Sequence, residues 1–263
     1  ADAASRVEGR FRERGATVVS NAGSFRRDPE VPLVVPEVNA AHIEAVKVQR
    51  DKHGGAIVTN PNCSTIGLCL ALDPLEKAFG LERVAVTTLQ ALSGAGHPGV
   101  PSLEALDNVL PEIRGEEEKV EWEPRKIFGA RAEGAFVPAG LRVSAQCTRV
   151  PVHDGHTLSV SVKLGRQAGL DEVRRAYSDY RSSLAGLGLP SAPERPVVLE
   201  ESPCRPQPLL DRDASGGMAV TVGRLRPCPV LGFRLVALVH NTIRGAAGGT
   251  VLIAEYMAAE GLI

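Results

Sequence analysis

The chain of 263 residues is 43% hydrophobic, which is enough for a sizeable core in one large domain or two smaller ones. Its formal net charge of −1 argues against nucleic acid and anionic membrane surfaces as electrostatic partners. The five cysteines form neither a CxxC pair nor a Cys/His cluster of zinc spacing, so we expect reduced thiols, a cytoplasmic location and no metal site. No apolar run approaches the roughly 20 residues that a membrane helix needs.

The chain opens in a predicted amphipathic helix, with Ala4, Val7 and Phe11 on one face. Residue 1 is alanine, and no glycine-rich turn of the kind that cradles a dinucleotide pyrophosphate precedes the first predicted strand. We therefore expect that the sequence is incomplete at its N-terminus and that the nucleotide-binding turn is missing from it.

A parallel α/β unit is predicted for the next part of the chain, because short apolar runs alternate with a helical one. Strands are expected at residues 16–20, 33–35 and 55–58, and a helix at 40–49. Open α/β sheets bind ligands beyond the carboxyl ends of their strands, so the segment after residue 58 is a predicted site.

The sequence Asn-Pro-Asn-Cys-Ser-Thr at residues 60–65 joins the third strand to a predicted helix at 66–79. Ser64 or Thr65 can cap that helix, which would place Cys63 beside unpaired backbone N–H groups. Such groups favour an anion, so we expect a lowered thiol pKa and a reactive thiolate. The alternative is that Cys63 is a small buried apolar residue, as most cysteines are.

Beyond residue 63 the predicted strands alternate apolar and polar residues, which is typical of a mostly antiparallel sheet with helices on one face. Strands are expected at residues 84–89, 141–148, 157–164, 218–225 and 233–239, with a tight turn at Asp154-Gly155. Helices are expected at 103–110, at 170–184 with Asp171 as N-cap, and at 246–259. The proline-rich residues 190–208 are predicted to be irregular.

Residues 94–99 match the pattern G-x-G-x-x-G after a predicted strand. Pro98 and Pro101 interrupt the helix that should follow, and no second strand ends in an acidic residue about 20 positions later. We interpret this segment as a flexible loop on the substrate side and not as a nucleotide site.

Four segments resemble the aspartate-semialdehyde dehydrogenase family, and their amino-acid sequences are most similar to its archaeal and fungal branch. They are residues 60–65, 88–96, 146–156 and 240–248, which together reach across nearly the whole chain. The resemblance implies an α/β protein that combines the remainder of a Rossmann-type NADP-binding domain with an α+β catalytic and dimerisation domain. The first would hold residues 1–62 with 245–263, and the second residues 63–244 with a mostly antiparallel sheet.

The same resemblance implies a phosphorylating reaction between L-aspartate 4-semialdehyde and L-4-aspartyl phosphate, with NADP as cofactor, in lysine, threonine and methionine synthesis. Cys63 would attack the aldehyde carbon, and inorganic phosphate would later cleave the resulting thioester. His156 would shuttle the proton, with His153 as its competitor. Gln90 would orient the substrate, and the planar fork of Arg149 would bind its carboxylate. A homodimer or homotetramer is implied as well.

The remaining roles follow from the resemblance in the same way. Arg26 matches the arginine that binds phosphate, although the adjoining Arg27 could take its place. Further substrate-side residues would be Lys119, Glu116 and Asn62, and the cofactor side would include Asn241, Gly245, Ser93 and Gly94. A purely structural role is the alternative for these residues. A run of acidic and basic residues is usually a solvated helix face, and a histidine after Asp-Gly is usually a solvated turn residue.

Other functions fit parts of the sequence. Malonyl-CoA or succinyl-CoA reductases share the branch and would not need the phosphate residues, and N-acetyl-glutamyl-phosphate reductases share the mechanism with a different cysteine segment. A cysteine hydrolase would use Cys63 and His156 with water as acceptor and without nicotinamide. A catalytically silent fragment would fold and associate but bind no cofactor.

Overall fold

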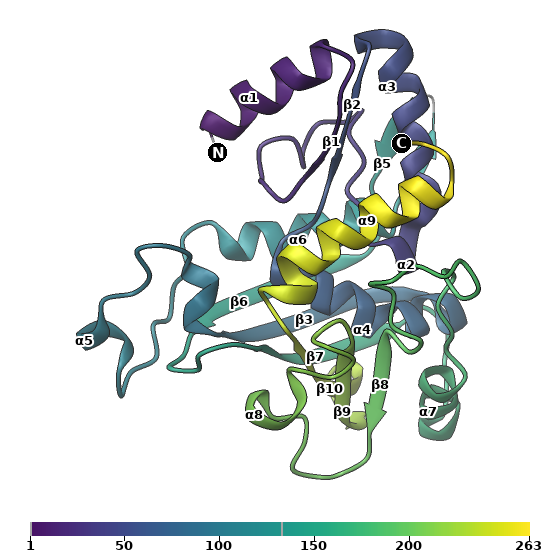
Figure 1. The fold of residues 1–263 in the computed structure, drawn as a ribbon. Helices are drawn as coiled ribbons and strands as arrows, with labels where there is room; N and C mark the ends of the chain where they lie inside the picture. Colours follow the sequence, from purple (N-terminus) through teal and green to yellow (C-terminus); the bar gives the residue numbers. More distant parts are fainter. Residues whose placement is uncertain (1, 133) are drawn as a thin grey trace.

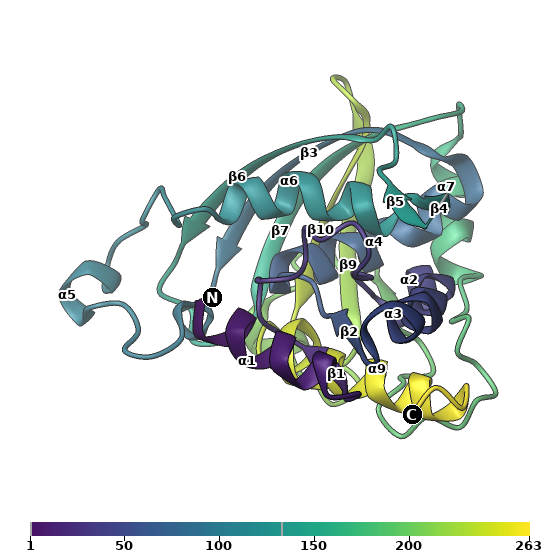
Figure 2. The same ribbon diagram turned by 90° about the horizontal axis from the view of Figure 1, so that it is seen from above.

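The computed structural model describes residues 2–132 and 134–263. A two-stranded parallel sheet and a six-stranded mixed sheet lie apart from each other, with helices between them (Figure 1). The view from above shows that α6 lies along the strands of the larger sheet (Figure 2). The helices therefore separate a smaller N-terminal unit from the sheet domain.

The N-terminal unit is built around the parallel pair of β1 and β2, in which Thr17 is the register partner of Ala56. Its elements are α1 (Asp2–Glu13), β1 (Thr17–Ser20), α2 (Pro36–Asn39), the 3₁₀ helix η1 (Ala40–Glu44), α3 (Ala45–His53) and β2 (Ala56–Thr59). The predicted strand at 33–35 is wrong, because Leu33 forms only an isolated bridge to Thr59. Val7 and Phe11 are exposed, so the described residues do not cover the predicted apolar face of α1.

The six strands of the larger sheet come from distant parts of the chain. Their order is β6 (Arg142–Arg149), β3 (Leu81–Gln90), β7 (His156–Leu164), β10 (Gly232–Val239), β9 (Val220–Cys228) and β8 (Val197–Glu200). The three central pairs are antiparallel and the two outer pairs are parallel. Because β3 lies between β6 and β7, the predicted tight turn at Asp154-Gly155 does not close a hairpin.

Three helices cover one face of this sheet: α4 (Cys63–Phe79), α6 (Glu116–Ile127) and α7 (Leu170–Ser178). Each of them contacts strands of the sheet, and α4 also contacts the other two helices. Their apolar residues and the inward side chains of the strands form one large core, in which Leu68, Leu72, Val160 and Leu235 are buried. Such burial of apolar surface is the main favourable term in folding, at about 25 cal/mol per Å². It fixes α4, and with it Cys63, against the sheet.

The remaining elements are η2 (Leu92–Ala95), α5 (Ser102–Ala105), β4 (Ala130–Ala132), β5 (Ala135–Val137), α8 (Pro208–Asp211), the π-helix η3 (Ile243–Ala247) and α9 (Gly248–Ala259). Ile253 and Met257 of α9 pack with Val46 and Val58, so the last helix returns to the N-terminal unit as expected.

Two of the predicted helices are wrong in extent. The one expected at 103–110 is the single turn α5, because Leu103 and Leu106 contact water and not a core. The one expected at 170–184 ends at Ser178. Its N-cap is Gly169 and not Asp171, and the Gly169 N–H donates to the Glu172 carboxylate at 2.7 Å.

Candidate active site

Cys63 and His156 meet at the centre of the candidate active site. The Cys63 Sγ lies 3.3 Å from Nε2 of His156. Cys63 is the first residue of α4, and His156 is the first residue of β7. Two segments 93 positions apart in sequence are thus combined by packing α4 against the sheet.

The start of α4 is capped by Asn62. Its Oδ1 accepts the backbone N–H groups of Ser64 at 2.9 Å and Thr65 at 3.3 Å. The prediction that Ser64 or Thr65 forms the cap is therefore wrong by two or three residues. Asparagine is among the strongest N-cap residues, because its carbonyl oxygen satisfies donors that have no partner within the helix.

His156 is held in one tautomer by the backbone. Its Nδ1 accepts the N–H of Ala91 at 3.0 Å, so Nδ1 carries no proton and the proton of the neutral ring lies on Nε2. Burial, with the nearby Arg149 cation, lowers the pKa of His156 to about 3. His156 is therefore a neutral ring that directs an N–H at the sulfur.

His153 lies elsewhere. Its side chain is exposed and pairs with Asp154. Of the two histidines, His156 thus contacts the thiol and His153 faces solvent.

The thiol itself does not have the lowered pKa that the sequence predicted. Burial and the Glu116 carboxylate raise the pKa of Cys63 to about 12, against the opposing effects of the Ser64 N–H, Arg26 and Arg149. The helix N-terminus is where it was predicted, but its effect is outweighed by loss of solvation. In this state of the site the sulfur is protonated.

Gln90 and Arg149 lie side by side next to the thiol. They are register partners at the ends of the parallel strands β3 and β6. Arg149 Nη1 donates to the carbonyl oxygen of Ala91 at 2.8 Å, so Ala91 positions both the arginine and His156. Gly94 passes so close that a Cβ there would lie 2.8 Å from Arg149 Nη1 and from a ring carbon of His156. Gly94, the first residue of the G-x-G-x-x-G segment, thus borders this site.

Glu116 connects three of the predicted substrate residues. Its Oε1 accepts from the side-chain amides of Asn62 at 2.7 Å and Gln90 at 3.2 Å. Its Oε2 lies 3.1 Å from Nζ of Lys119, whose side chain is partly exposed. The acidic run at the start of α6 is therefore not only a solvated face, because Glu116 is buried in the site.

Arg26 is buried and reaches the same region through Glu123. Its Nη1 lies 3.0 Å from Glu123 Oε1, and its Nη2 donates to the carbonyl oxygen of Asn21 at 2.9 Å. The other carboxylate oxygen of Glu123 accepts the backbone N–H of Asn62 at 2.7 Å. Arg27 instead pairs with the exposed Glu118 on the surface, so only Arg26 is linked to the cysteine segment.

Glu123 is the residue that the sequence reasoning missed. It is fully buried, and burial raises its pKa in spite of the Arg26 cation and the Asn62 N–H. The available signal was helical spacing, because a residue seven positions after Glu116 lies on the same face of a helix.

The predicted cofactor residues border the thiol from the other side. A Cβ at Gly245 would lie 2.7 Å from the Cβ of Cys63, so this position tolerates only glycine without movement. The Asn241 side chain accepts the Gly155 N–H and donates to the Ser93 hydroxyl, both at 2.8 Å. Asn241 thus connects Ser93 of η2 to Gly155, the residue that precedes His156.

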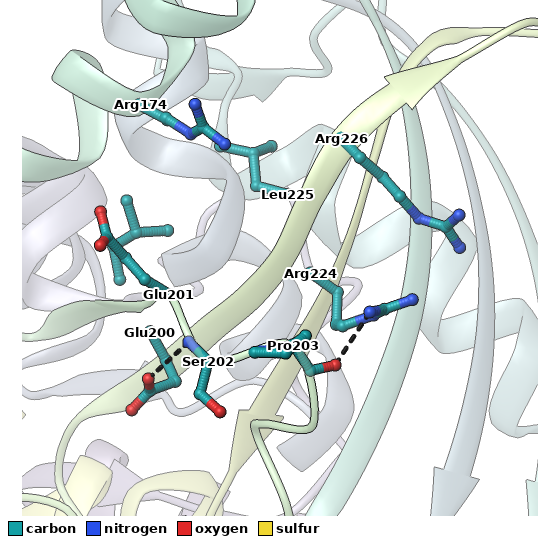
Figure 3. A pocket seen from close by; sticks show the side chains of 9 residues that line it. Arg174, Glu200, Glu201, Ser202, Pro203, Arg224, Leu225 and Arg226 are labelled. Carbon is teal, nitrogen blue, oxygen red and sulfur yellow. Dashed lines mark hydrogen bonds between the residues drawn. The ribbon is translucent and has the colours of Figure 1, made fainter.

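Other features of the structure lie away from this site. A hollow of about 460 Å³ between α7, β8 and β9 contains Arg174, Arg224 and Arg226 with Glu200 and Glu201 (Figure 3). Within residues 2–132 and 134–263, no group of three or more His, Cys, Asp and Glu side chains could hold a metal ion. No helix in the described part of the chain is both long and apolar enough to cross a membrane.

Two family models match the chain. The dimerisation domain of semialdehyde dehydrogenases matches residues 72–244, and the NAD binding domain of semialdehyde dehydrogenases matches residues 1–46. The match to the second model supports binding of a nicotinamide cofactor, and the match to the first supports a dimer.

Curated relatives named aspartate-semialdehyde dehydrogenase match over the whole chain. That of Methanothermobacter thermautotrophicus is 51% identical over 97% of this chain and 74% of its own length. That of Archaeoglobus fulgidus is 49% identical over 100% of this chain and 76% of its own. The chain thus spans about three quarters of the length of these relatives.

Solved structures agree with this result. The structure of aspartate semialdehyde dehydrogenase with NADP from Candida albicans superposes with a TM-score of 0.91 at 45% identity, covering 100% of this chain and 76% of that one. Aspartate semialdehyde dehydrogenase II from Vibrio cholerae gives a TM-score of 0.78 at 29% identity, covering 98% and 77%. The expected fold class is confirmed, and the chain belongs to the aspartate-semialdehyde dehydrogenase family.

Proposed function

We propose that this chain interconverts L-aspartate 4-semialdehyde and L-4-aspartyl phosphate with NADP and inorganic phosphate, through a thioester on Cys63. The observation that carries this proposal is the contact of 3.3 Å between Cys63 Sγ and Nε2 of His156, beside the paired Gln90 and Arg149. The names of the relatives supply the substrate, and the site supplies a nucleophile, a hydrogen-bond donor and a carboxylate-binding arginine. Such a reaction belongs to the synthesis of lysine, threonine and methionine.

His156 stabilises negative charge in this scheme. The Cys63 sulfur bonds to the aldehyde carbon while the carbon–oxygen double bond opens, and the thiol proton passes to the carbonyl oxygen, which becomes the hydroxyl of the thiohemiacetal. The Nε2–H that faces the sulfur is placed to donate a hydrogen bond to the sulfur and then to that oxygen, where it stabilises the negative charge that develops during the transfer. Because Nδ1 accepts the Ala91 N–H, His156 can become a cation only if it gives up this hydrogen bond.

Arg149 and Gln90 orient the substrate. A guanidinium binds a carboxylate with two parallel hydrogen bonds, which fixes the direction of the substrate as well as its affinity. The Arg149 side chain is held by the Ala91 carbonyl and has further N–H groups for this purpose. Gln90 is held by Glu116, so its amide is fixed before the substrate binds.

Phosphate cleaves the thioester in the last step. Its oxygen attacks the acyl carbon, the carbon–sulfur bond breaks, and the Cys63 thiolate is released. Lys119 has a partly exposed side chain, and its ammonium group forms an ion pair with Glu116, so it is available to an incoming anion. Arg26 already uses Nη1 and Nη2 for Glu123 and Asn21, so phosphate has to compete for them.

The chain's own residues fit a nicotinamide beside the thiol. Gly245 and Gly94 leave space where a side chain would collide, and the Asn241 amide holds the loops on that side. The cofactor accepts hydride from the substrate carbon when it is bound. The choice of NADP, a homodimer or homotetramer and a cytoplasmic location belong to this proposal.

The test is the formation of NADPH from aspartate semialdehyde by the purified protein, with and without inorganic phosphate. We expect an increase in absorbance at the NADPH wavelength that requires both phosphate and NADP. Reduction that requires coenzyme A in place of phosphate would support an acyl-CoA reductase. Turnover without any nicotinamide would support a hydrolase.

A further inference from the structure

Residues 21–32 form a loop between β1 and α2 that contains neither helix nor strand. Its internal backbone hydrogen bonds close single turns, such as the bond from the Val31 N–H to the Asp28 carbonyl at 3.3 Å. Ordering such a loop costs conformational entropy, which contacts from other elements must offset. The loop carries Arg26, so the position of this arginine in the candidate site depends on those contacts.

Lys126 of α6 binds this loop through three backbone carbonyl groups. Its Nζ donates to the carbonyl oxygens of Arg26 at 2.8 Å, Asp28 at 2.7 Å and Val31 at 2.8 Å. A protonated lysine has three N–H donors and no acceptor, so its whole hydrogen-bonding capacity is used on the loop. One ammonium group therefore fixes three points of the loop.

The Lys126 side chain is enclosed at this position. The residue is 6% exposed, and its ammonium group lies 5.1 Å from the centre of the Phe136 ring. The Phe136 N–H in turn donates to the Pro29 carbonyl at 3.3 Å, so β5 holds the same loop. Burial lowers the pKa of Lys126 to about 8, against the opposing effects of Asp28 and Glu123. A cation is thus buried at a cost, which points to a role that an apolar side chain could not fill.

One face of α6 holds both the backbone and the side chain of Arg26. Glu123 pairs with the Arg26 guanidinium at 3.0 Å, and Lys126 holds the Arg26 carbonyl. Residues three positions apart lie on the same face of a helix. Glu116, near the start of the same helix, accepts from the Asn62 side chain at 2.7 Å. The helix therefore sets the position of Arg26 relative to the segment that carries the thiol.

We propose that Lys126 is a positioning residue for inorganic phosphate, because it fixes the loop that presents the Arg26 guanidinium to this anion. This role rests on the proposed function, in which phosphate competes with Glu123 and Asn21 for the Arg26 donors. Lys126 itself does not bind the anion, since its three N–H groups are bound to carbonyl oxygens. Without Lys126 the loop samples other conformations, and the apparent affinity for phosphate falls with the fraction of molecules in which Arg26 is in place.

Hydrogen exchange tests the holding of the loop without any measurement of activity. The variant is Lys126→Met, whose side chain has a similar length and no donor. The control is Lys77→Met, because Lys77 also lies 5.1 Å from an aromatic ring, that of Tyr180, and donates to the carbonyl oxygen of Glu37. Amide exchange in residues 26–31, measured by mass spectrometry, should become faster in Lys126→Met and stay unchanged in Lys77→Met. Unchanged exchange in Lys126→Met would overturn the proposal.

Steady-state kinetics test the positioning of Arg26. Lys126→Met should raise the KM for phosphate roughly tenfold, as the loss of one charge-assisted hydrogen bond would, and leave the KM for aspartate semialdehyde nearly unchanged. A purely structural role of Lys126 would lower the amount of active protein, and thus the rate, without changing one KM selectively. An unchanged KM for phosphate, or equal rises of both constants, would contradict the positioning.

Lys126→Gln replaces the methionine variant if circular dichroism shows that the latter does not fold. Its amide keeps two N–H donors for the loop, and the same selective rise in the KM for phosphate is expected.

A wild type without turnover would refute the proposed function, and exchange would then decide the role of Lys126. Inorganic phosphate at millimolar concentration should slow amide exchange in residues 26–31 of the wild type and not in those of the Lys126 variant. Equal slowing in both proteins, or no slowing in the wild type, would overturn the positioning.

Discussion

Ala91 connects His156 to Arg149 through its peptide groups: its N–H donates to Nδ1 of the histidine, and its carbonyl accepts from Nη1 of the arginine. One residue directly after β3 thus sets the tautomer of the ring and the position of the guanidinium. Five predictions concern this site and the residues that support it.

Stability should depend on His156 below neutral pH. Its pKa is about 3 in the folded chain and 6.5 in the unfolded chain, so between these values the unfolded chain binds one more proton and stability falls as the pH falls. Between pH 6.5 and pH 5 the loss is about 2 kcal/mol, at 1.36 kcal/mol per pKa unit. Urea unfolding at both values should show a smaller loss for His156→Gln. An equal loss in the wild type and the variant would contradict the buried neutral ring.

Cys63→Ser should lower turnover by several orders of magnitude, because a serine hydroxyl stays protonated at neutral pH and gives no comparable nucleophile. The measurement is NADPH formation under saturating substrate. Cys204→Ser is the matched control, because Cys204 is the exposed cysteine and lies outside the site, and it should keep the wild-type rate. Substantial turnover in Cys63→Ser would remove Cys63 from the reaction.

Arg149→Lys should raise the KM for aspartate semialdehyde by about 10- to 100-fold, since hydrogen bonds to a charged group contribute about 1.5–3 kcal/mol and a lysine cannot make the paired contact. Arg142→Lys is a control on the same strand, where the arginine is exposed. Steady-state kinetics give the KM of each variant for aspartate semialdehyde. A KM within twofold of the wild type would exclude Arg149 as the carboxylate ligand.

Lys119→Met should raise the KM for phosphate by roughly tenfold and leave the KM for the semialdehyde nearly unchanged, because the ammonium group would contact only the anion. Lys47→Met is the control. Lys47 forms an i,i+3 ion pair with Glu44 on the surface, and Lys119 forms an ion pair of the same spacing with the buried Glu116. Titration with phosphate should show the raised KM for phosphate in Lys119→Met and not in Lys47→Met. Equal effects of the two substitutions would show that Lys119 has only a surface role.

Glu123→Gln should destabilise the fold by about 3–5 kcal/mol, because it leaves the buried Arg26 without its counter-charge. A double variant in which Arg26 and Glu123 are both leucine should lose less than the sum of the two single leucine variants. Urea unfolding of all the variants gives the coupling free energy between the two side chains. Strictly additive losses would mean that the two side chains do not interact.

Much of the site could be predicted from short segments, because local chemistry determines them. The sequence shows a cysteine, Cys63, between a predicted strand and a predicted helix. It also shows a histidine, His156, seven residues after an arginine, Arg149. Five of the six strands of the larger sheet were predicted for the same reason, since an alternating pattern has one buried face. The sixth, β8, lies within residues 190–208, which were wrongly predicted to be irregular throughout. Whether those residues carry the proposed roles is left to the kinetic measurements above.

Where the prediction failed, a contact between distant residues decided the result. The helix expected at 103–110 has the right composition but packs on no core, so it stays a single turn. The thiol has its predicted helix terminus, yet burial and Glu116 raise its pKa.

The sequence by itself determined the family, the mostly antiparallel centre of the sheet and the segments that meet at Cys63, because motifs and hydrophobic periodicity are properties of neighbouring residues. Only the tertiary structure showed that Arg26 and His156 lie at the site while Arg27 and His153 lie at the surface, and only it revealed Glu123. Adjacent residues of one type look equivalent along the chain, and they differ once folding buries one beside a partner and leaves the other in water.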